Sequence, residues 1–131
     1  MKHALAVPPD FGAVAPARRW AAAHLRAAGV EGHLLDVLVL LVSEVVTNAV
    51  AHASPPVHVG LEIAGGVARV EVTDRARAVP VIRRPAPTQG GGRGVGLVDM
   101  LATRWGVIEA TDEDTPKTVW FEVALDDVRP G

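Results

Sequence analysis

The sequence predicts an α+β fold of two layers, in which helices cover one face of a mainly antiparallel sheet. Two observations lead to this expectation. Apolar residues recur with a period near 3.6 across residues 14–52, as in helices, and with a period near 2 across 57–73 and 117–125, as in strands. The chain has 131 residues and is 49% hydrophobic, which suits one compact domain spanning 1–131.

The first half of the chain is expected to hold an edge strand and two helices. Residues 2–7 form a short alternating segment. An Ala-rich helix is predicted over 14–28, and Gly29 stands where a C-terminal cap is expected. A second helix over 33–52 carries a wide apolar face and ends before a Ser-Pro-Pro segment. Its length of about five turns suits a central packing element.

Strand signals dominate the second half of the chain. Residues 57–63 and 67–73 alternate between apolar and polar side chains, and the Gly-Gly pair between them predicts a hairpin. Periodicity then disappears over 75–93, where prolines, glycines and basic residues indicate a functional lid or a disordered insert. The remaining expected elements are a short helix from about Val95 and two strands at 105–110 and 117–125.

Composition removes several classes of function. The net charge is −2 and no long run of Lys or Arg is present, so nucleic-acid binding is disfavoured. The absence of cysteine excludes disulfides, thiolate metal sites and thiol catalysis, and the five histidines lack metal-binding spacing. The longest apolar run, 37–42, is far shorter than a membrane span, and the N-terminus does not read as a signal peptide. We therefore expect a cytoplasmic protein without a membrane partner.

Three polar residues interrupt the second helix at regular intervals. Glu44, Asn48 and His52 lie four residues apart, so on a helix they form one stripe. Burying a carboxylate and an amide without partners is costly, so this stripe indicates the wall of a site for a polar ligand, such as a metal and its phosphates. Each residue also has a simpler explanation: Glu44 and Asn48 could face water, and His52 could favour the helix C-terminus.

A second candidate site element is the glycine-rich segment 90–97, which runs directly into the predicted third helix. Glycines let a phosphate approach the backbone, and the free N–H groups of a helix start attract an anion, although such turns are often merely flexible. The segment is neither the dinucleotide fingerprint nor the Lys-containing phosphate loop. Asp74 ends the hairpin where the expected lid begins. It could be a turn former or a part of the same site.

The combination of these motifs resembles the GHKL ATPase superfamily, which includes histidine kinases, gyrase-type ATPases and Hsp90. Within it, the chain is most similar to the small stand-alone anti-sigma-factor serine/threonine kinases of bacteria, especially actinobacterial ones. The resemblance covers about residues 10–125. It is carried by the segments 40–52, 92–101, 104–107 and 117–122. It implies the two-layer α/β sandwich of the Bergerat type.

The resemblance also implies roles for individual residues. Asn48 would bind Mg2+ through its amide oxygen, and Glu44 would act as the general base toward a hydroxyl or water. His52 belongs to the same cofactor-binding face. Asp74 would accept a hydrogen bond from the adenine amino group, and Thr118 would support the adenine end of the pocket.

The phosphate side of the implied pocket comes from the glycine-rich segment. The implied phosphate-binding residues are Gly92, Arg93, Gly94, Val95, Gly96 and Leu97. The family usually has Asp-x-Gly at the adenine end, whereas this chain reads Asp74-Arg75-Ala76. If that glycine has positive φ or lets adenine approach closely, Ala76 costs about 1 kcal/mol and narrows the base pocket. We therefore expect weak nucleotide affinity.

The leading hypothesis is an ATP- and Mg2+-dependent kinase that phosphorylates a serine or threonine of an anti-sigma factor antagonist and, in another state, sequesters a sigma factor. The alternative is a nucleotide-sensing module with negligible transfer, in which ATP or ADP orders the lid and changes a partner surface. A scaffold without a ligand is the third hypothesis. A homodimer is expected because relatives of this kind commonly pair.

Overall fold

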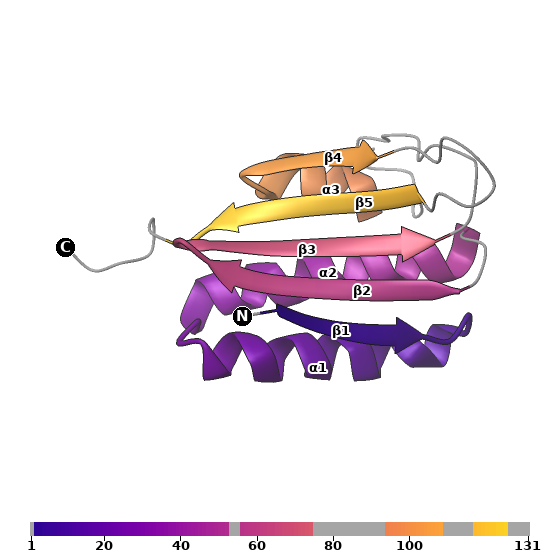
Figure 1. Cartoon of the computed structure of the whole chain (residues 1–131), viewed down its shortest axis with the longest axis horizontal. Helices are drawn as coiled ribbons and strands as arrows, with labels where there is room; N and C mark the ends of the chain where they lie inside the picture. Colours follow the sequence, from indigo (N-terminus) through magenta and orange to yellow (C-terminus); the bar gives the residue numbers. More distant parts are fainter. Residues whose placement is uncertain (1, 53–55, 75–93, 109–116, 126–131) are drawn as a thin grey trace, which may run out of the picture.

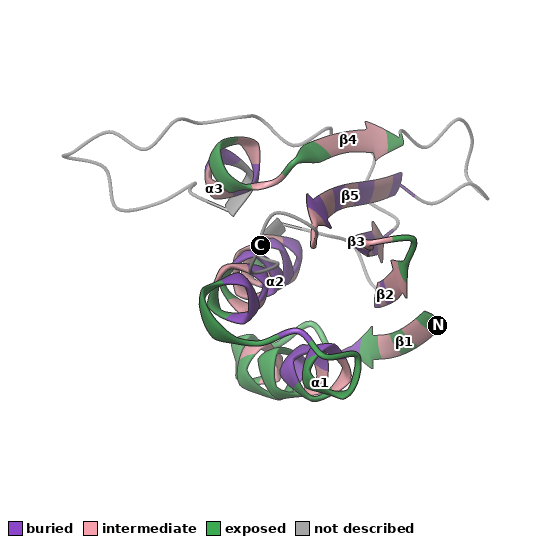
Figure 2. Cartoon of the chain, turned by 90° about the vertical axis from the view of Figure 1, so that its left-hand side faces the viewer, coloured by how far each residue is buried: buried purple, intermediate pink, exposed green. Residues whose placement is uncertain are grey.

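A computed structural model describes residues 2–52, 56–74, 94–108 and 117–125. In this part of the chain the strands form one five-stranded antiparallel sheet with the order β1-β2-β3-β5-β4. The helices cover one face of the sheet, and the other face is open (Figure 1, Figure 2). The predicted α+β class with helices on one face is therefore confirmed.

The elements follow the predicted order along the chain. Their bounds are β1 (Lys2–Val7), a 3-10 turn η1 (Phe11–Ala13), α1 (Val14–Ala27), α2 (Gly32–His52), β2 (Val57–Ala64), β3 (Val67–Asp74), α3 (Gly94–Leu101), β4 (Arg104–Ile108) and β5 (Lys117–Ala124). The helices α2 and α3 and the strand β4 each begin one residue earlier than the periodicity predicted. The expected lid 75–93 and residues 109–110 lie outside the described residues.

Gly29 ends α1 as expected. Its φ of 89° is in the left-handed region that favours glycine. The N–H of Gly29 donates to the carbonyl of Arg26 and the N–H of Val30 donates to the carbonyl of Leu25, each at 2.9 Å. These two bonds form a Schellman cap, which turns the chain back toward α2.

The core lies between the sheet and α2. Leu38, Leu41, Val42 and Val46 on α2 are 0% exposed, and Phe121 on β5 is 1% exposed. In Figure 2, α2 lies between α1 and α3, beside the sheet. Apolar side chains around much of the circumference of α2 therefore have packing partners.

The central position of α2 explains why the whole helix is apolar, which the short uninterrupted run 37–42 did not indicate. By length and composition alone, Gly32–Ala51 is apolar enough to cross a membrane. A helix packed between two other helices and a sheet needs the same apolar content. We therefore interpret α2 as the central helix of the core.

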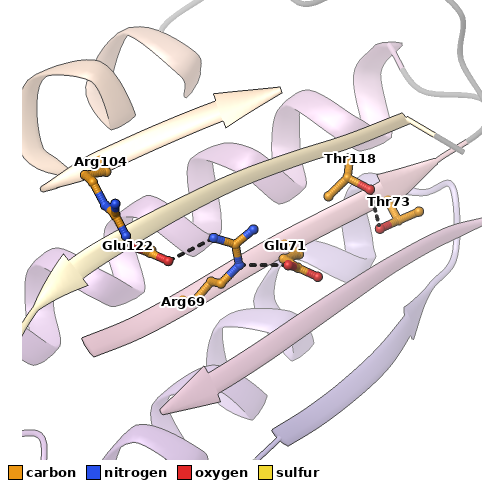
Figure 3. Close-up of polar contacts among 6 residues, drawn as sticks. All are labelled: Arg69, Glu71, Thr73, Arg104, Thr118 and Glu122. Atoms are coloured by element: carbon orange, nitrogen blue, oxygen red, sulfur yellow. Dashed lines mark hydrogen bonds and ion pairs between the residues drawn. The ribbon is translucent and has the colours of Figure 1, made fainter. Parts of the chain in front are cut away.

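The open face of the sheet carries a polar network that joins three strands (Figure 3). Arg69 on β3 donates to Glu71 and to Glu122 on β5, each at 2.8 Å. Arg104 on β4 donates from Nε to Glu122 at 3.0 Å. Hydrogen bonds from Arg104 and then Arg69 hold the pKa of Glu122 below its ordinary value. Glu122 thus links β3, β5 and β4.

Trp120 occupies the same face beside this network. The guanidinium of Arg69 lies 4.3 Å from the Trp120 ring centroid, which is a cation–π distance. On β4, a Cβ at Gly106 would come within 2.9 Å of the indole. Glycine is therefore required at this position so that the Trp120 ring can pack closely against the neighbouring strand.

An aromatic cluster holds the edge strand β1 against α1. The rings of His3 and His24 stack with centroids 3.6 Å apart, and Trp20 meets His24 edge-on at 5.4 Å. The Nε2 atom of His3 is buried and has no hydrogen-bond partner within the described part of the chain. Burial, followed by the neighbouring His24, lowers the pKa of His3 below its ordinary value of 6.5.

We expect this cluster to make stability depend on pH. Because the folded pKa of His3 is below the unfolded value, the unfolded state binds more protons, and stability falls as the pH drops through 6.5 toward the folded pKa. Thermal unfolding between about pH 7 and pH 5 should show a falling Tm, and His3→Phe should flatten part of that fall. The exposed His33 provides the control, since His33→Phe should leave the dependence unchanged. Equal pH profiles for the wild type and His3→Phe would contradict the prediction.

Candidate functional site

The candidate site lies at one end of the molecule, where four elements meet. The C-terminal end of α2, the end of β3 and the starts of α3 and β5 all lie at the right-hand end of Figure 1. Chain direction explains this convergence, because α2 and β3 run toward this end while α3 and β5 run away from it. The polar residues that the sequence singled out belong to these elements.

The stripe on α2 is partly exposed. Glu44 and Asn48 are both half-buried and lie about one helical turn apart on the same face. Neither side chain has a hydrogen bond or ion pair with another described residue. Their desolvation is therefore smaller than the sequence argument assumed, and their oxygen atoms are accessible on that face. His52 is the last residue of α2, and its side chain lies outside the described residues.

The end of β3 places a carboxylate on the helix-covered side of the sheet. Asp74 is 3% exposed and follows the buried alternation of Val70 and Val72. It pairs in register with Lys117, the first residue of β5. The Nζ of Lys117 lies 3.6 Å from Oδ2 of Asp74, and the two side chains are 9% and 3% exposed. Asp74 is thus one half of a buried ion pair.

Sequence reasoning missed Lys117 and chose its neighbour, Thr118. Thr118 pairs with Thr73, and their hydroxyl oxygens lie 3.3 Å apart on the open face of the sheet (Figure 3). The structure therefore does not bring Thr118 to the side where Asp74 lies. The signal was present in the alternation of β5, since Lys117 shares the side of the apolar Val119, Phe121 and Val123.

The start of α3 brings the glycine-rich segment to the same end. Gly94 and Val95 are in the first turn of α3, and Gly96 is buried. The first N–H groups of such a helix have no intrahelical acceptor, so they are suited to an anion. The side chain of Leu97 packs on the core, so only its backbone could face a ligand.

Side chains farther along the chain fix the position of α3. Val98 is 1% exposed and packs in the core, and Asp99 accepts a hydrogen bond from the indole Nε1 of Trp105 at 2.9 Å. The helix start is thereby held against α2 and β4. Ala76, Gly92 and Arg93 lie outside the described residues.

Comparison with known proteins identifies the family. A family model described as the histidine kinase-like ATPase domain matches residues 7–122. The chain belongs to the histidine kinase-like ATPase family. The resemblance stated from the sequence is thereby confirmed, and the family implies that the chain binds ATP. No curated protein matches this ATPase domain.

Solved structures of the same architecture include larger proteins. The structure of the RsbU and RsbW domains of Rv1364c from Mycobacterium tuberculosis has a TM-score of 0.71 and 19% identity, covering 95% of this chain and 32% of that chain. At this identity the likeness concerns the fold.

Two structures from Erythrobacter litoralis are also similar to this ATPase domain. The blue-light activated histidine kinase has a TM-score of 0.51 and 30% identity, covering 72% of this chain and 34% of that chain. The histidine kinase domain of that protein has a TM-score of 0.52 and 26% identity, covering 87% and 61%. The chain thus spans about a third of the length of the solved Mycobacterium tuberculosis chain and of the longer Erythrobacter chain.

Proposed function

We propose that this ATPase domain binds Mg-ATP at the end where α2, β3 and α3 converge and transfers the γ-phosphoryl group to a serine or threonine of a protein. The observation that carries this proposal is the convergence itself, in a chain of the histidine kinase-like ATPase family. The polar face of α2 suits the metal, the carboxylate at the end of β3 suits the adenine, and the N-terminus of α3 suits the phosphates.

In this proposal the helix α2 supplies the metal ligand and the base. Asn48 is half-buried and its amide makes no bond to another described residue, so it fits a hard cation that keeps several waters. Bound Mg2+ would neutralise phosphate charge. Glu44, one turn earlier, would accept the proton of the attacking hydroxyl.

The sheet and α3 would hold the two ends of the nucleotide. The carboxylate of Asp74 would accept a hydrogen bond from the adenine amino group. The first N–H groups of α3, at Gly94 to Gly96, would face the phosphates, together with Gly92 and Arg93. Ala76 would adjoin the base.

The protein partner is proposed to be an anti-sigma factor antagonist, with a sigma factor sequestered in another state and a homodimer as the acting form. The sequence segments that resemble stand-alone anti-sigma kinases support this, as does the fold similarity to a protein with an RsbW domain. Such a regulator of transcription would act in the cytoplasm.

Calorimetric titration with Mg-ATP tests the binding step. We expect saturable 1:1 binding, and a ligand at about 100 times Kd should add about 2.7 kcal/mol of stability, which raises Tm by several degrees. Asn48→Ala should remove most of this stabilisation. Thr47→Ala is the matched control, because the Thr47 hydroxyl is already bonded to the Ser43 carbonyl at 2.7 Å. No Mg-ATP-dependent change in Tm would refute the proposal.

A nucleotide-sensing module without transfer is the second candidate. It is favoured by the buried Lys117, which engages the carboxylate proposed to bind adenine. A weakened adenine contact would lower nucleotide affinity without abolishing a response to ATP or ADP. Binding without transfer to any serine- or threonine-bearing antagonist would favour this candidate.

A further inference from the structure

A groove runs between α1 and α2, outside the proposed nucleotide site. One part has a volume of about 470 Å3 and is lined by Arg18, Arg19 and Arg26 of α1 and by Val39 of α2. A second part, of about 400 Å3, shares Arg18, Arg26 and Val39 and extends to Leu40. Because the two hollows share these residues, they form one continuous groove along the pair of helices.

The groove has an apolar floor and a basic rim. Ala22 and Val39 line the floor, and Leu40 leaves 41% of its surface exposed beside them. Arg18, Arg19 and Arg26 are exposed, and within the described residues none of the three guanidinium groups has an ion-pair partner.

The charge of this surface is opposite to that of the whole chain. The chain carries a net charge of −2, whereas three arginines and one carboxylate, that of Asp36, line the groove. An exposed leucine, Leu40, beside the half-buried Val39 and a cluster of exposed arginines is typical of a binding surface for an acidic partner.

We propose that this groove binds an acidic amphipathic helix of a protein partner. Apolar side chains of the partner would pack on Ala22, Val39 and Leu40, and its carboxylates would pair with the arginines. Arg18 and Arg26 are two turns apart on α1, about 12 Å along the axis, so the partner helix would carry acidic residues about two turns apart.

The groove is continuous with the stripe on α2. Leu40 precedes Glu44 by about one turn, so a helix bound in the groove would pass close to the proposed catalytic residue. The binding proposal itself does not rest on nucleotide chemistry, and its failure would leave the Mg-ATP proposal untouched.

Fluorescence anisotropy of the full chain, without nucleotide, tests the groove. The probe is a labelled synthetic helix of about 18 residues, with leucines along one face and glutamates flanking them. The double variant Arg18→Glu, Arg26→Glu should weaken binding at least about tenfold. Lys2→Glu makes the same kind of charge change at an exposed residue of β1, away from the groove, and should keep affinity within about twofold. Raising ionic strength from about 50 to about 300 mM should weaken binding severalfold.

Several outcomes would overturn the proposal. They are the absence of probe binding to the wild type, equal binding to the double arginine variant, or equal binding of a twin probe with lysines in place of glutamates. Vesicles of phosphatidylserine and phosphatidylcholine form a further arm. If the wild type binds these vesicles through Arg18 and Arg26 and does not bind the helix, the surface serves a lipid and the proposal is wrong. Circular dichroism confirms that each variant is folded.

Discussion

Replacing Glu44 by glutamine should lower phosphoryl transfer to an antagonist protein by about 100-fold or more, because general-base assistance contributes on this scale. The substitution keeps the shape of the side chain and removes only its ability to take a proton. Affinity for Mg-ATP, measured calorimetrically, should therefore stay within about threefold. Transfer of labelled phosphate from ATP to a candidate antagonist measures the effect.

The control for this experiment is Glu31→Gln. Glu31 is exposed and lies just before α2. Its replacement by glutamine changes the net charge by the same amount as Glu44→Gln, outside the candidate site. Full transfer activity in Glu44→Gln would exclude Glu44 as the base. A parallel loss of transfer and of Mg-ATP affinity would instead assign it to binding.

Replacing Lys117 by methionine should destabilise the fold by about 3 kcal/mol, since it removes the lysine that forms an ion pair with the buried carboxylate of Asp74. For a domain of this size the expected fall in Tm is roughly 10 °C. Thermal unfolding without nucleotide, at neutral pH, measures it.

Two further variants separate the loss of the pair from the loss of the lysine side chain. The double variant Asp74→Asn, Lys117→Met should recover part of the stability, because it removes the buried negative charge together with the lysine that balanced it. Lys2→Met removes an exposed lysine and should leave Tm within about 1 °C. A Tm for Lys117→Met equal to that of the wild type would show that the pair contributes nothing to stability.

The fold class followed from local patterns, whereas the strand order did not. Periodicity located the α-helices and strands of the described residues but not the short 3-10 helix at Phe11–Ala13, because amphipathic spacing is dictated by which side of each element is buried. The insertion of β5 between β3 and β4 depends on contacts between distant segments, such as Val70 with Phe121, and no local pattern encodes that pairing.

The sequence predicts those parts of the candidate site that depend on a single helix, and not those that depend on contacts between elements. The spacing of Glu44 and Asn48 sets their common face as soon as α2 is a helix. The partner of Asp74 depends on the register of two strands, and this is why Lys117 escaped notice. The stacking of His3 on His24 depends in the same way on how β1 meets α1.

The connections of this fold differ between its two ends. At the end away from the candidate site, β2 turns into β3 at Gly65 and Gly66, with φ of 60° and 75°, and only two residues separate α3 from β4. The ends of β3 and β4 and the starts of α3 and β5 lie at the other end, separated in the sequence by the longer segments 75–93 and 109–116. Evolution can lengthen or rewrite those two segments without shifting any register of the sheet, so ligand and partner preference can diverge while the scaffold stays the same.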